Sequence, residues 1–258
     1  AIEYLPFLGT SKYSPAEIQQ EFYKIGCEFD VFASDERIYV TLSGLDENFE
    51  AGMQLFEHLL ADAQPEEEAL NSLVSNILKT RADDKLNKGN ILFGAMASYA
   101  QYGPTSPFKN ILSEDELKAL VAKNLTDKIK TLNSYEHRVL YYGPKNNADL
   151  AGLIKANHKA PAELKPLPNS IDFVEQENEG NKVYYVDYDM KQAEIYMLSK
   201  KELYNPETVA LAAIYNEYFG GGMGSIVFQE MRESKALAYS VYSAFRTPSD
   251  TAKSHYVM

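Results

Sequence analysis

Two side chains near the carboxyl end of the chain, Arg232 and Tyr239, could assist a reaction. They are the fixed ends of the pattern R-x-x-x-x-L-x-Y, and a guanidinium and a phenol both donate hydrogen bonds. Such donors can meet a developing negative charge without acting as nucleophiles. The structural alternative is an arginine on a helix surface that packs against a tyrosine of the following strand. The pattern alone leaves both interpretations open.

A run of three glycines, Gly220, Gly221 and Gly222, precedes this pair. Glycine adopts positive φ without strain and lets another backbone or a ligand come close. A glycine loop can also cradle a phosphate, but phosphate loops follow a strand. Here a helical pattern over residues 211–219 comes first, so we expect the glycines to allow close packing.

Spacing and caps predict the elements that position these residues. Ser225 is expected to cap a helix that carries Arg232, and residues 238–245 alternate as in a half-buried strand. Residues 28–32 and 37–42 predict a hairpin around a turn at 33–36. Further helices are expected over residues 1–8, 90–102 and 147–158. Other helices are expected to begin at Ser14-Pro15, Asp46, Pro65, Ser113 and Asn205-Pro206, and the one from Pro65 is expected to run past Asp84. Further strands are expected over residues 137–142, 183–188 and 194–199 and from Ser254.

The composition bounds the class of protein. A chain of 258 residues is long enough for one large domain or two smaller ones. Its 25 basic and 37 acidic residues give a net charge of −12. This charge argues against nucleic acid as a partner, because phosphate binding needs clustered lysine and arginine. No apolar run is long enough to span a bilayer. The single cysteine, Cys27, excludes an internal disulfide and is expected in the core.

The order of elements favours an α+β fold in two similar halves, each an antiparallel sheet with helices packed on one face. Three prolines between residues 160 and 168 indicate a linker. We expect a first half over residues 1–159, a linker over 160–170 and the start of a second half over 171–258. Because the chain begins as a helix end and stops on a strand, we expect a fold truncated at both ends that can self-associate through uncovered apolar surface.

The run FGGGMGSIVFQEMRESKALAYSV, from Phe219 to Val241, resembles the second-half signature of the pitrilysin/insulinase family of zinc peptidases. Ala236 stands where that family usually has glycine. The segment from Phe7 to Leu42 resembles the stretch that follows the family's zinc-binding helix. The resemblance implies a metallopeptidase fold of the LuxS/MPP-like type, with two halves around a chamber and zinc on one half only. It also implies that Arg232 and Tyr239 face this chamber and contact the peptide or its oxyanion.

The zinc motif of this family, H-x-x-E-H, is degenerate here. Alignment by resemblance puts Glu3 at the general base and Tyr4 at the second histidine, and tyrosine is a poor zinc ligand. No glutamate occurs between Glu68 and Glu114, where the last ligand should lie. The four histidines are not spaced as metal ligands, and we expect each to be solvated or capped; they are at positions 58, 137, 158 and 255. We therefore expect no catalytic residue and no metal in this chain, with zinc on a catalytic partner half.

Two functions follow from these observations. Our first hypothesis is the non-catalytic half of a pitrilysin-like metallopeptidase, inactive alone, which helps to bind an extended peptide substrate. Its catalytic half is then either part of the same polypeptide or a separate subunit. The alternative is a degenerate member of the family that acts as a structural or assembly subunit without a role in hydrolysis. An intact H-x-x-E-H upstream would favour the first. We expect a soluble protein, for which the bacterial periplasm and the cytoplasm both remain open.

Overall fold

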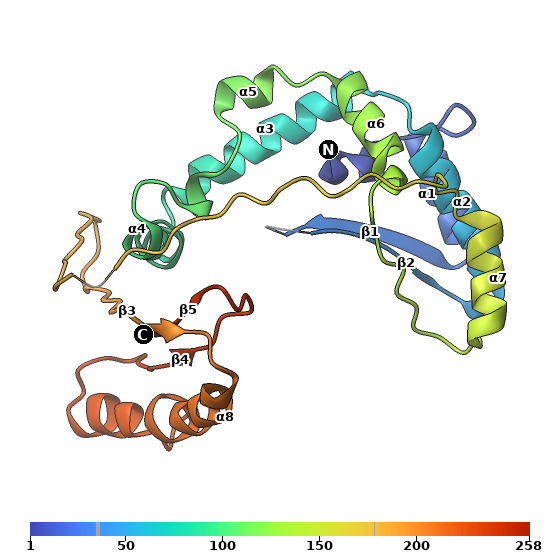
Figure 1. The fold of residues 1–258 in the computed structure, drawn as a ribbon. Coiled ribbons are helices and arrows are strands. Elements are labelled where there is room, and N and C mark those ends of the chain that lie inside the picture. Colours follow the sequence, from blue (N-terminus) through green and yellow to red (C-terminus); the bar gives the residue numbers. More distant parts are fainter. Residues whose placement is uncertain (35–36, 178) are drawn as a thin grey trace. The chain divides into compact units, whose positions relative to one another are not determined.

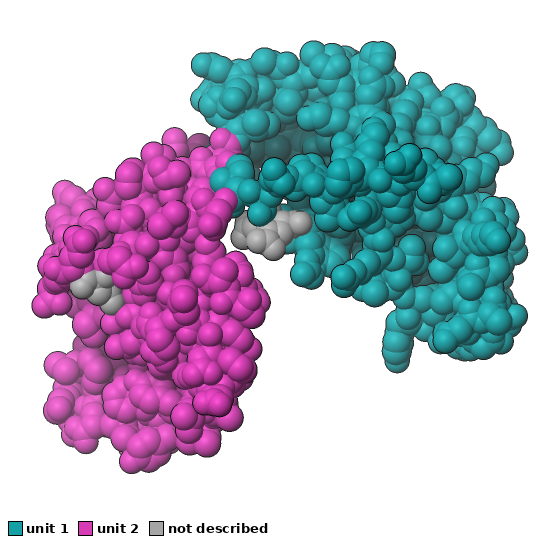
Figure 2. All heavy atoms as spheres, viewed as in Figure 1, with its two compact units in different colours: residues 1–81, 112–171 teal, residues 82–111, 172–258 magenta. Residues whose placement is uncertain are grey.

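The computed structural model describes residues 1–34, 37–177 and 179–258. Two compact units divide the chain, and each is assembled from two separate stretches (Figure 2). Unit 1 contains residues 1–81 and 112–171, and unit 2 contains residues 82–111 and 172–258. Helices and antiparallel sheets occur together, which confirms the expected α+β class. The division into two halves joined by a linker at 160–170 stays a prediction.

A two-stranded antiparallel hairpin forms in unit 1, as the alternation of its residues predicts (Figure 1). Strand β1 (Cys27–Ala33) pairs along its whole length with strand β2 (Ile38–Gly44). Cys27 and Val31 are buried on one face of β1, as period-2 alternation requires. The predicted turn spans residues 33–36, of which 35 and 36 lie outside the described residues.

Two helices of unit 1 begin at the caps that the sequence predicts, whereas the helices expected from Asp46 and Pro65 begin at Phe49 and Glu67 and residues 2–7 form a 3-10 turn. The hydroxyls of Ser14 and Ser113 each accept the N–H three residues on, and Glu17 and Glu116 bond back to the serine N–H groups. These are two complete capping boxes. The helices are α1 (Pro15–Lys24), α2 (Phe49–Asp62), α3 (Glu67–Asp84, ending in unit 2), α5 (Glu114–Lys118), α6 (Ala122–Lys130) and α7 (Asn147–Asn157), with the 3-10 turns η1 (Ile2–Phe7), η2 (Asp46–Asn48) and η5 (Leu132–Ser134).

The core of unit 1 lies where α1, α2 and the hairpin meet. Phe22 of α1 packs on Phe29 of β1, which packs on Phe56 of α2, with ring centroids 5.1 and 5.6 Å apart. Leu59 of α2 and Ile129 of α6 are also buried. Each such side chain stabilises the fold by about 1.5–3 kcal/mol. This cluster therefore fixes α2 against the hairpin.

Unit 2 contains a three-stranded antiparallel sheet in the order β3-β5-β4 (Figure 1). Asn205 caps the helix after β3 by accepting the N–H of Glu207, as predicted. The elements are β3 (Ser199–Leu203), β4 (Phe245–Arg246) and β5 (Ser254–Val257), the helices α4 (Ala97–Tyr102) and α8 (Pro206–Tyr215), the 3-10 turn η4 (Pro107–Lys109), and the π-helical segments η3 (Asn90–Met96), η6 (Asn216–Gly220) and η7 (Phe228–Ser234). Among the helices that the structure describes, none combines the length and hydrophobicity needed to cross a membrane.

Four predicted strands are wrong, in segments that the structure describes in full. Residues 137–142 and 183–188 contain no strand, of residues 194–199 only Ser199 belongs to one, and of residues 238–245 only Phe245 does. A strand is stable only when a neighbour pairs with its backbone groups. Among the described residues, no strand pairs with segments 137–142 and 183–188, and their apolar side chains are exposed, as Leu140 and Val183 show at 86% and 92%.

Helix ends follow local side-chain hydrogen bonds. The helix predicted to run past Asp84 ends at that residue. The Asn87 side chain accepts the N–H groups of Gly89 and Asn90, and this turn competes with further helix. Gly103 ends α4 with a φ of +74°, as the Gly-Pro signal predicts.

Candidate functional site

The glycine run meets a second stretch of backbone in unit 2. A Cβ atom on Gly220 would stand 1.8 Å from the carbonyl oxygen of Ser243, so no side chain fits there. The N–H of Ser243 donates to the carbonyl of Gly220 at 3.3 Å. Gly222 has a φ of +76°, in the left-handed region that favours glycine. These contacts are those of close packing, and they tie the loop to the chain before β4.

Ser225 caps the helix that carries Arg232, as predicted. Its buried hydroxyl accepts the N–H of Phe228 at 3.3 Å, and its carbonyl accepts the N–H of Gln229 at 3.0 Å. The hydroxyl also donates to the carbonyl of Gly222 at 2.9 Å. The glycine loop and the helix start therefore form one hydrogen-bonded unit. The helix then widens into the π-helical segment η7, a geometry found often at functional sites.

The structure brings Arg232 and Tyr239 together. The guanidinium carbon lies 4.7 Å from the centroid of the Tyr239 ring and 4.8 Å from that of Phe228. A cation–π contact at an exposed site contributes about 0.5–1 kcal/mol. The Nε atom of Arg232 is also 3.5 Å from a carboxylate oxygen of Glu233. These contacts orient the guanidinium without covering it.

A strained turn lies between the two residues. Ala236 has a φ of +47°, which alanine rarely adopts. The N–H of Ala236 donates to the carbonyl of Arg232, and that of Leu237 to the carbonyl of Met231 at 2.8 Å. The turn carries the chain back, so that Tyr239 reaches the arginine. This positive φ gives a physical reason for glycine at the position in the resembling family.

Both members of the pair are accessible. The Tyr239 ring is 84% exposed and the Arg232 side chain 35% exposed. Tyr239 lies outside any strand, contrary to the prediction for residues 238–245. Its hydroxyl makes no hydrogen bond to another residue in the described part of the chain. The geometry thus offers a guanidinium and a phenol, side by side, to a ligand that accepts hydrogen bonds.

Tyr4, which the resemblance aligns with the second histidine of the zinc motif, has the opposite character. Tyr4 is fully buried, and its hydroxyl donates to the carbonyl of Glu66 at 2.5 Å and accepts the N–H of the same residue at 2.8 Å. Burial raises the pKa of the Tyr4 phenol. Glu3, its neighbour on η1, is exposed. A phenol held by two backbone groups cannot serve as a metal ligand, so a zinc ion does not fit at this position.

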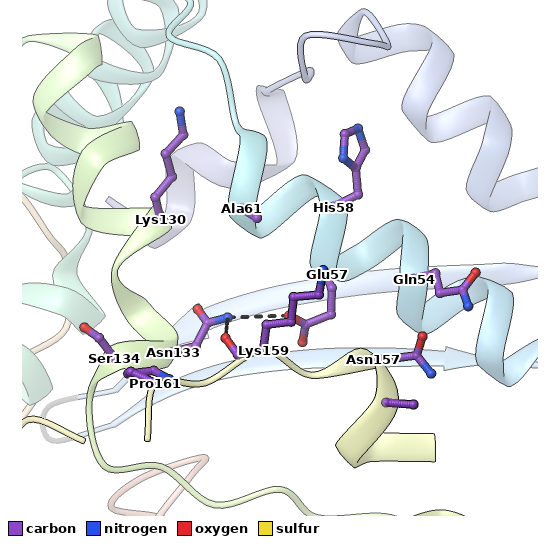
Figure 3. A pocket seen from close by; sticks show the side chains of 11 residues that line it. Gln54, Glu57, His58, Ala61, Lys130, Asn133, Ser134, Asn157, Lys159 and Pro161 are labelled. Atoms are coloured by element: carbon purple, nitrogen blue, oxygen red, sulfur yellow. Dashed lines mark hydrogen bonds between the residues drawn. The ribbon is translucent and has the colours of Figure 1, made fainter. Parts of the chain in front are cut away.

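A polar hollow of about 560 Å³ opens beside α2 in unit 1 (Figure 3). Glu57 and His58 of α2 contribute to its wall, together with Lys130, Asn133 and Lys159. The amide nitrogen of Asn133 lies 3.5 Å from a Glu57 carboxylate oxygen and 3.4 Å from the carbonyl of Lys159. The hollow therefore presents both signs of charge. No sequence pattern predicts this hollow, because its residues come from three separate segments of the chain.

Two histidines meet next to this hollow, although 21 residues separate them in sequence. The Nε2 atoms of His137 and His158 are 2.8 Å apart, and Nδ1 of His158 is 2.6 Å from Oε1 of Glu57. The spacing of the two histidines in the sequence does not predict this contact, since His158 caps the end of α7 and His137 follows an irregular segment. Of the described residues, no three His, Cys, Asp or Glu side chains form a group able to hold a metal ion.

The other two histidines have separate partners. Nε2 of His58 is 3.0 Å from the Thr10 hydroxyl. His255 is buried in β5 rather than solvated, and its Nε2 accepts the N–H of Asn205 at 3.1 Å. His255 thus bonds the N-cap residue of α8, which is a structural role.

Known proteins are similar to this chain over nearly its whole length. A model of the insulinase family, peptidase family M16, matches residues 2–103, and a model described as the peptidase M16 inactive domain matches residues 112–253. A protein of Rickettsia felis named as an uncharacterized zinc protease is 23% identical, over 97% of this chain and 60% of that protein. The chain therefore spans about 60% of that relative's length.

Solved structures show the same fold. The peptidase M16 inactive domain from Pseudomonas fluorescens matches with a TM-score of 0.67 at 16% identity, over 99% of this chain and 62% of that one. The ferredoxin protease FusC, in complex with Arabidopsis ferredoxin, matches with a TM-score of 0.68 at 12% identity, over 99% of this chain and 28% of that one.

Proposed function

The chain belongs to peptidase family M16, the insulinase family, and on this premise we propose that it is the non-catalytic half of a zinc metallopeptidase. One observation carries the proposal: Arg232 and Tyr239 are assembled and accessible, while Tyr4 is sealed into the core. The match of residues 112–253 to the inactive domain of the family supports the same assignment. By itself the chain then hydrolyses no peptide.

The Arg232–Tyr239 pair acts on the substrate in this proposal. Its guanidinium and hydroxyl donate hydrogen bonds to a peptide carbonyl, and more strongly to the oxyanion that forms from it. A zinc ion on the catalytic half would supply the activated water and the Lewis acid. The contact of Arg232 with two rings holds the guanidinium in one orientation, so less entropy is lost when the substrate binds.

The partners follow from the same assignment. The substrate is an extended, unfolded peptide, and the second partner is a catalytic half that carries an intact H-x-x-E-H. The relative from Rickettsia felis is longer than this chain, which is consistent with further family sequence in the same polypeptide. A separate catalytic subunit satisfies the proposal equally well.

A second candidate is a structural or assembly subunit with no part in hydrolysis. The observation that favours it is the contact between Arg232 and the Phe228 and Tyr239 rings, because a packing role alone explains such contacts. In that case the pair stabilises the turn at Ala236 and contacts no substrate.

Peptidase assays of this chain alone, of the zinc-bearing half alone and of the two together test the proposal. We expect turnover of an unstructured peptide only when both halves are present. The assembly role predicts that the zinc-bearing half, once folded, keeps its turnover when this chain carries Arg232→Ala. Turnover by this chain alone would overturn both candidates.

A further inference from the structure

Two imidazole rings of unit 1 face each other, nitrogen to nitrogen. The Nε2 atoms of His137 and His158 are 2.8 Å apart, and the ring planes cross at 79°. On the far side of each ring, Nδ1 of His158 lies 2.6 Å from Oε1 of Glu57, and Nδ1 of His137 lies 2.6 Å from the carbonyl oxygen of Tyr135. A carboxylate and a carbonyl only accept hydrogen bonds, so both Nδ1 atoms carry a hydrogen.

This hydrogen count leaves both Nε2 atoms with a lone pair directed at the other ring. Two facing lone pairs repel each other unless a cation lies between them. A single shared proton can fill that place and gives an N–H···N bond of the observed length. A metal ion bound by both nitrogens can fill it as well.

We propose that His137 and His158 form a binding site for a divalent transition-metal ion such as Zn²⁺, with Nε2 of each ring as ligand. The site is distinct from the degenerate peptidase position at Glu3 and Tyr4. It does not depend on the proposed function, because it involves other residues and no peptide. Imidazole nitrogen suits zinc, copper and nickel.

The surroundings of the rings support a metal more specifically than a chance contact does. Metal-binding histidines donate their second N–H to a carboxylate or a backbone carbonyl. Here the His158 ring has a carboxylate as its acceptor, and the His137 ring has a backbone carbonyl. The Glu57 carboxylate belongs to the wall of the adjoining hollow, which Lys130 and Lys159 also line (Figure 3). Glu57 and His158 are largely buried, so this half of the site is preformed.

A small movement completes the site. With metal–nitrogen distances of about 2.0–2.1 Å in a tetrahedral site, the two Nε2 atoms should be about 3.3 Å apart. His137 is exposed, so its ring can swing outward by the required half ångström or so. Water must supply the remaining ligands, because no third protein ligand joins the pair within the described residues. We therefore expect binding in the micromolar range, with release of the shared proton as the ion enters.

Calorimetric titration of the tag-free chain with ZnCl₂ tests the proposal. We expect one ion per chain and, in two buffers of different ionisation enthalpy, the heat of a released proton. His137→Ala should weaken binding at least tenfold, and it should leave the fold intact because this side chain is exposed. Glu57→Gln, which removes the charge behind His158, should weaken it by roughly ten- to a hundredfold.

His58→Gln is the matched control, since His58 lies beside Glu57 on α2 and lines the same hollow. Its binding curve should equal that of the unchanged chain. The absence of saturable binding, or equal affinity in the His137→Ala variant, would overturn the site. Circular dichroism of each variant separates lost ligands from lost folding. Because no peptidase partner is present, the result is independent of the peptidase assays.

Discussion

Tyr4 and Tyr239, the two tyrosines that the resemblance places at motif positions, lie in opposite environments. Tyr4 is fully buried, and two hydrogen bonds to Glu66 satisfy its hydroxyl. Tyr239 is 84% exposed, and its ring lies against a guanidinium while its hydroxyl faces solvent. The same type of side chain is thus a buried structural residue in unit 1 and an exposed hydrogen-bond donor in unit 2.

The difference teaches how a degenerate motif can be separated from a retained one. If the resemblance aligns Tyr4 correctly, a motif position without its original chemistry can be filled by packing, since this ring is buried and its hydroxyl is paired. A position that still serves a ligand must keep its polar atoms unsatisfied by the protein, and this costs stability. The turn at Ala236 carries a separate cost, the backbone strain of an alanine with a left-handed φ.

The largest effect is expected from removal of the buried tyrosine. Tyr4→Ala should lower the free energy of unfolding by about 3–5 kcal/mol, because it leaves a cavity and an unpaired backbone group. Tyr4→Phe keeps the ring and should cost about 1–3 kcal/mol. Urea denaturation measures both. An unchanged midpoint for Tyr4→Phe would mean that the Glu66 bonds contribute nothing.

A smaller free-energy change, seen in turnover instead of stability, is expected at the exposed pair. Arg232→Ala or Tyr239→Phe should lower kcat/KM of the assembled peptidase by roughly ten- to a thousandfold, as for the loss of one oxyanion donor. The melting temperature should barely change.

Tyr242→Phe is the control for this experiment, because Tyr242 is also an exposed tyrosine of the same segment. A silent Tyr239→Phe combined with an Arg232→Ala that unfolds easily would reverse the comparison. The pair would then be a packing contact, and the assembly role would be preferred.

The turn between Arg232 and Tyr239 offers a gain of stability. Ala236→Gly should raise the free energy of unfolding by about 0.5–1 kcal/mol, since glycine adopts the positive φ without strain. Ala238→Gly, two residues on, should instead be neutral or destabilising. If Ala236→Gly destabilises the chain, the strain at this turn is compensated in the folded state.

Alkaline pH should give the smallest effect. An unfolded tyrosine titrates near pH 10, and burial raises the pKa of folded Tyr4 above that value. The folded state therefore holds the phenolic proton more tightly. The stability that this provides is complete below pH 10 and is lost as the pH rises through the raised pKa. Tyr4→Phe should flatten this decline, which unfolding curves between about pH 9 and 11 would show.

Local signals were sufficient for much of the fold. Ser14, Ser113, Asn205 and Ser225 cap helices because each needs only a few neighbouring backbone groups. The hairpin of β1 and β2 is also local. Strands such as 183–188 could not be judged in this way, since a strand depends on a partner elsewhere in the chain.

In the candidate site too, the sequence predicts the local features and not those that depend on distant parts of the chain. The motif in the sequence singled out Arg232 and Tyr239, and the structure places them 4.7 Å apart from guanidinium carbon to ring centroid. The reason for glycine at position 220 depends on the Ser243 carbonyl, which no local pattern reveals. Likewise, His137 and His158 meet only because α7 and the segment around Tyr135 are folded against α2.

The interleaving of the two units has a consequence for the order of folding. Residues 82–111 belong to unit 2, yet their partners are made only after residues 112–171 have been synthesised. The carbonyl of Gln101 accepts a hydrogen bond from the N–H of Gln176, and that of Leu86 accepts one from the hydroxyl of Tyr188, so neither bond can form before the donor has been synthesised. At about 5–20 residues per second, this segment stays without its contacts for several seconds on the ribosome. Unit 1 can fold first. In a fragment that ends at residue 171, residues 82–111 would lack their partners from unit 2 and would be accessible to chaperones.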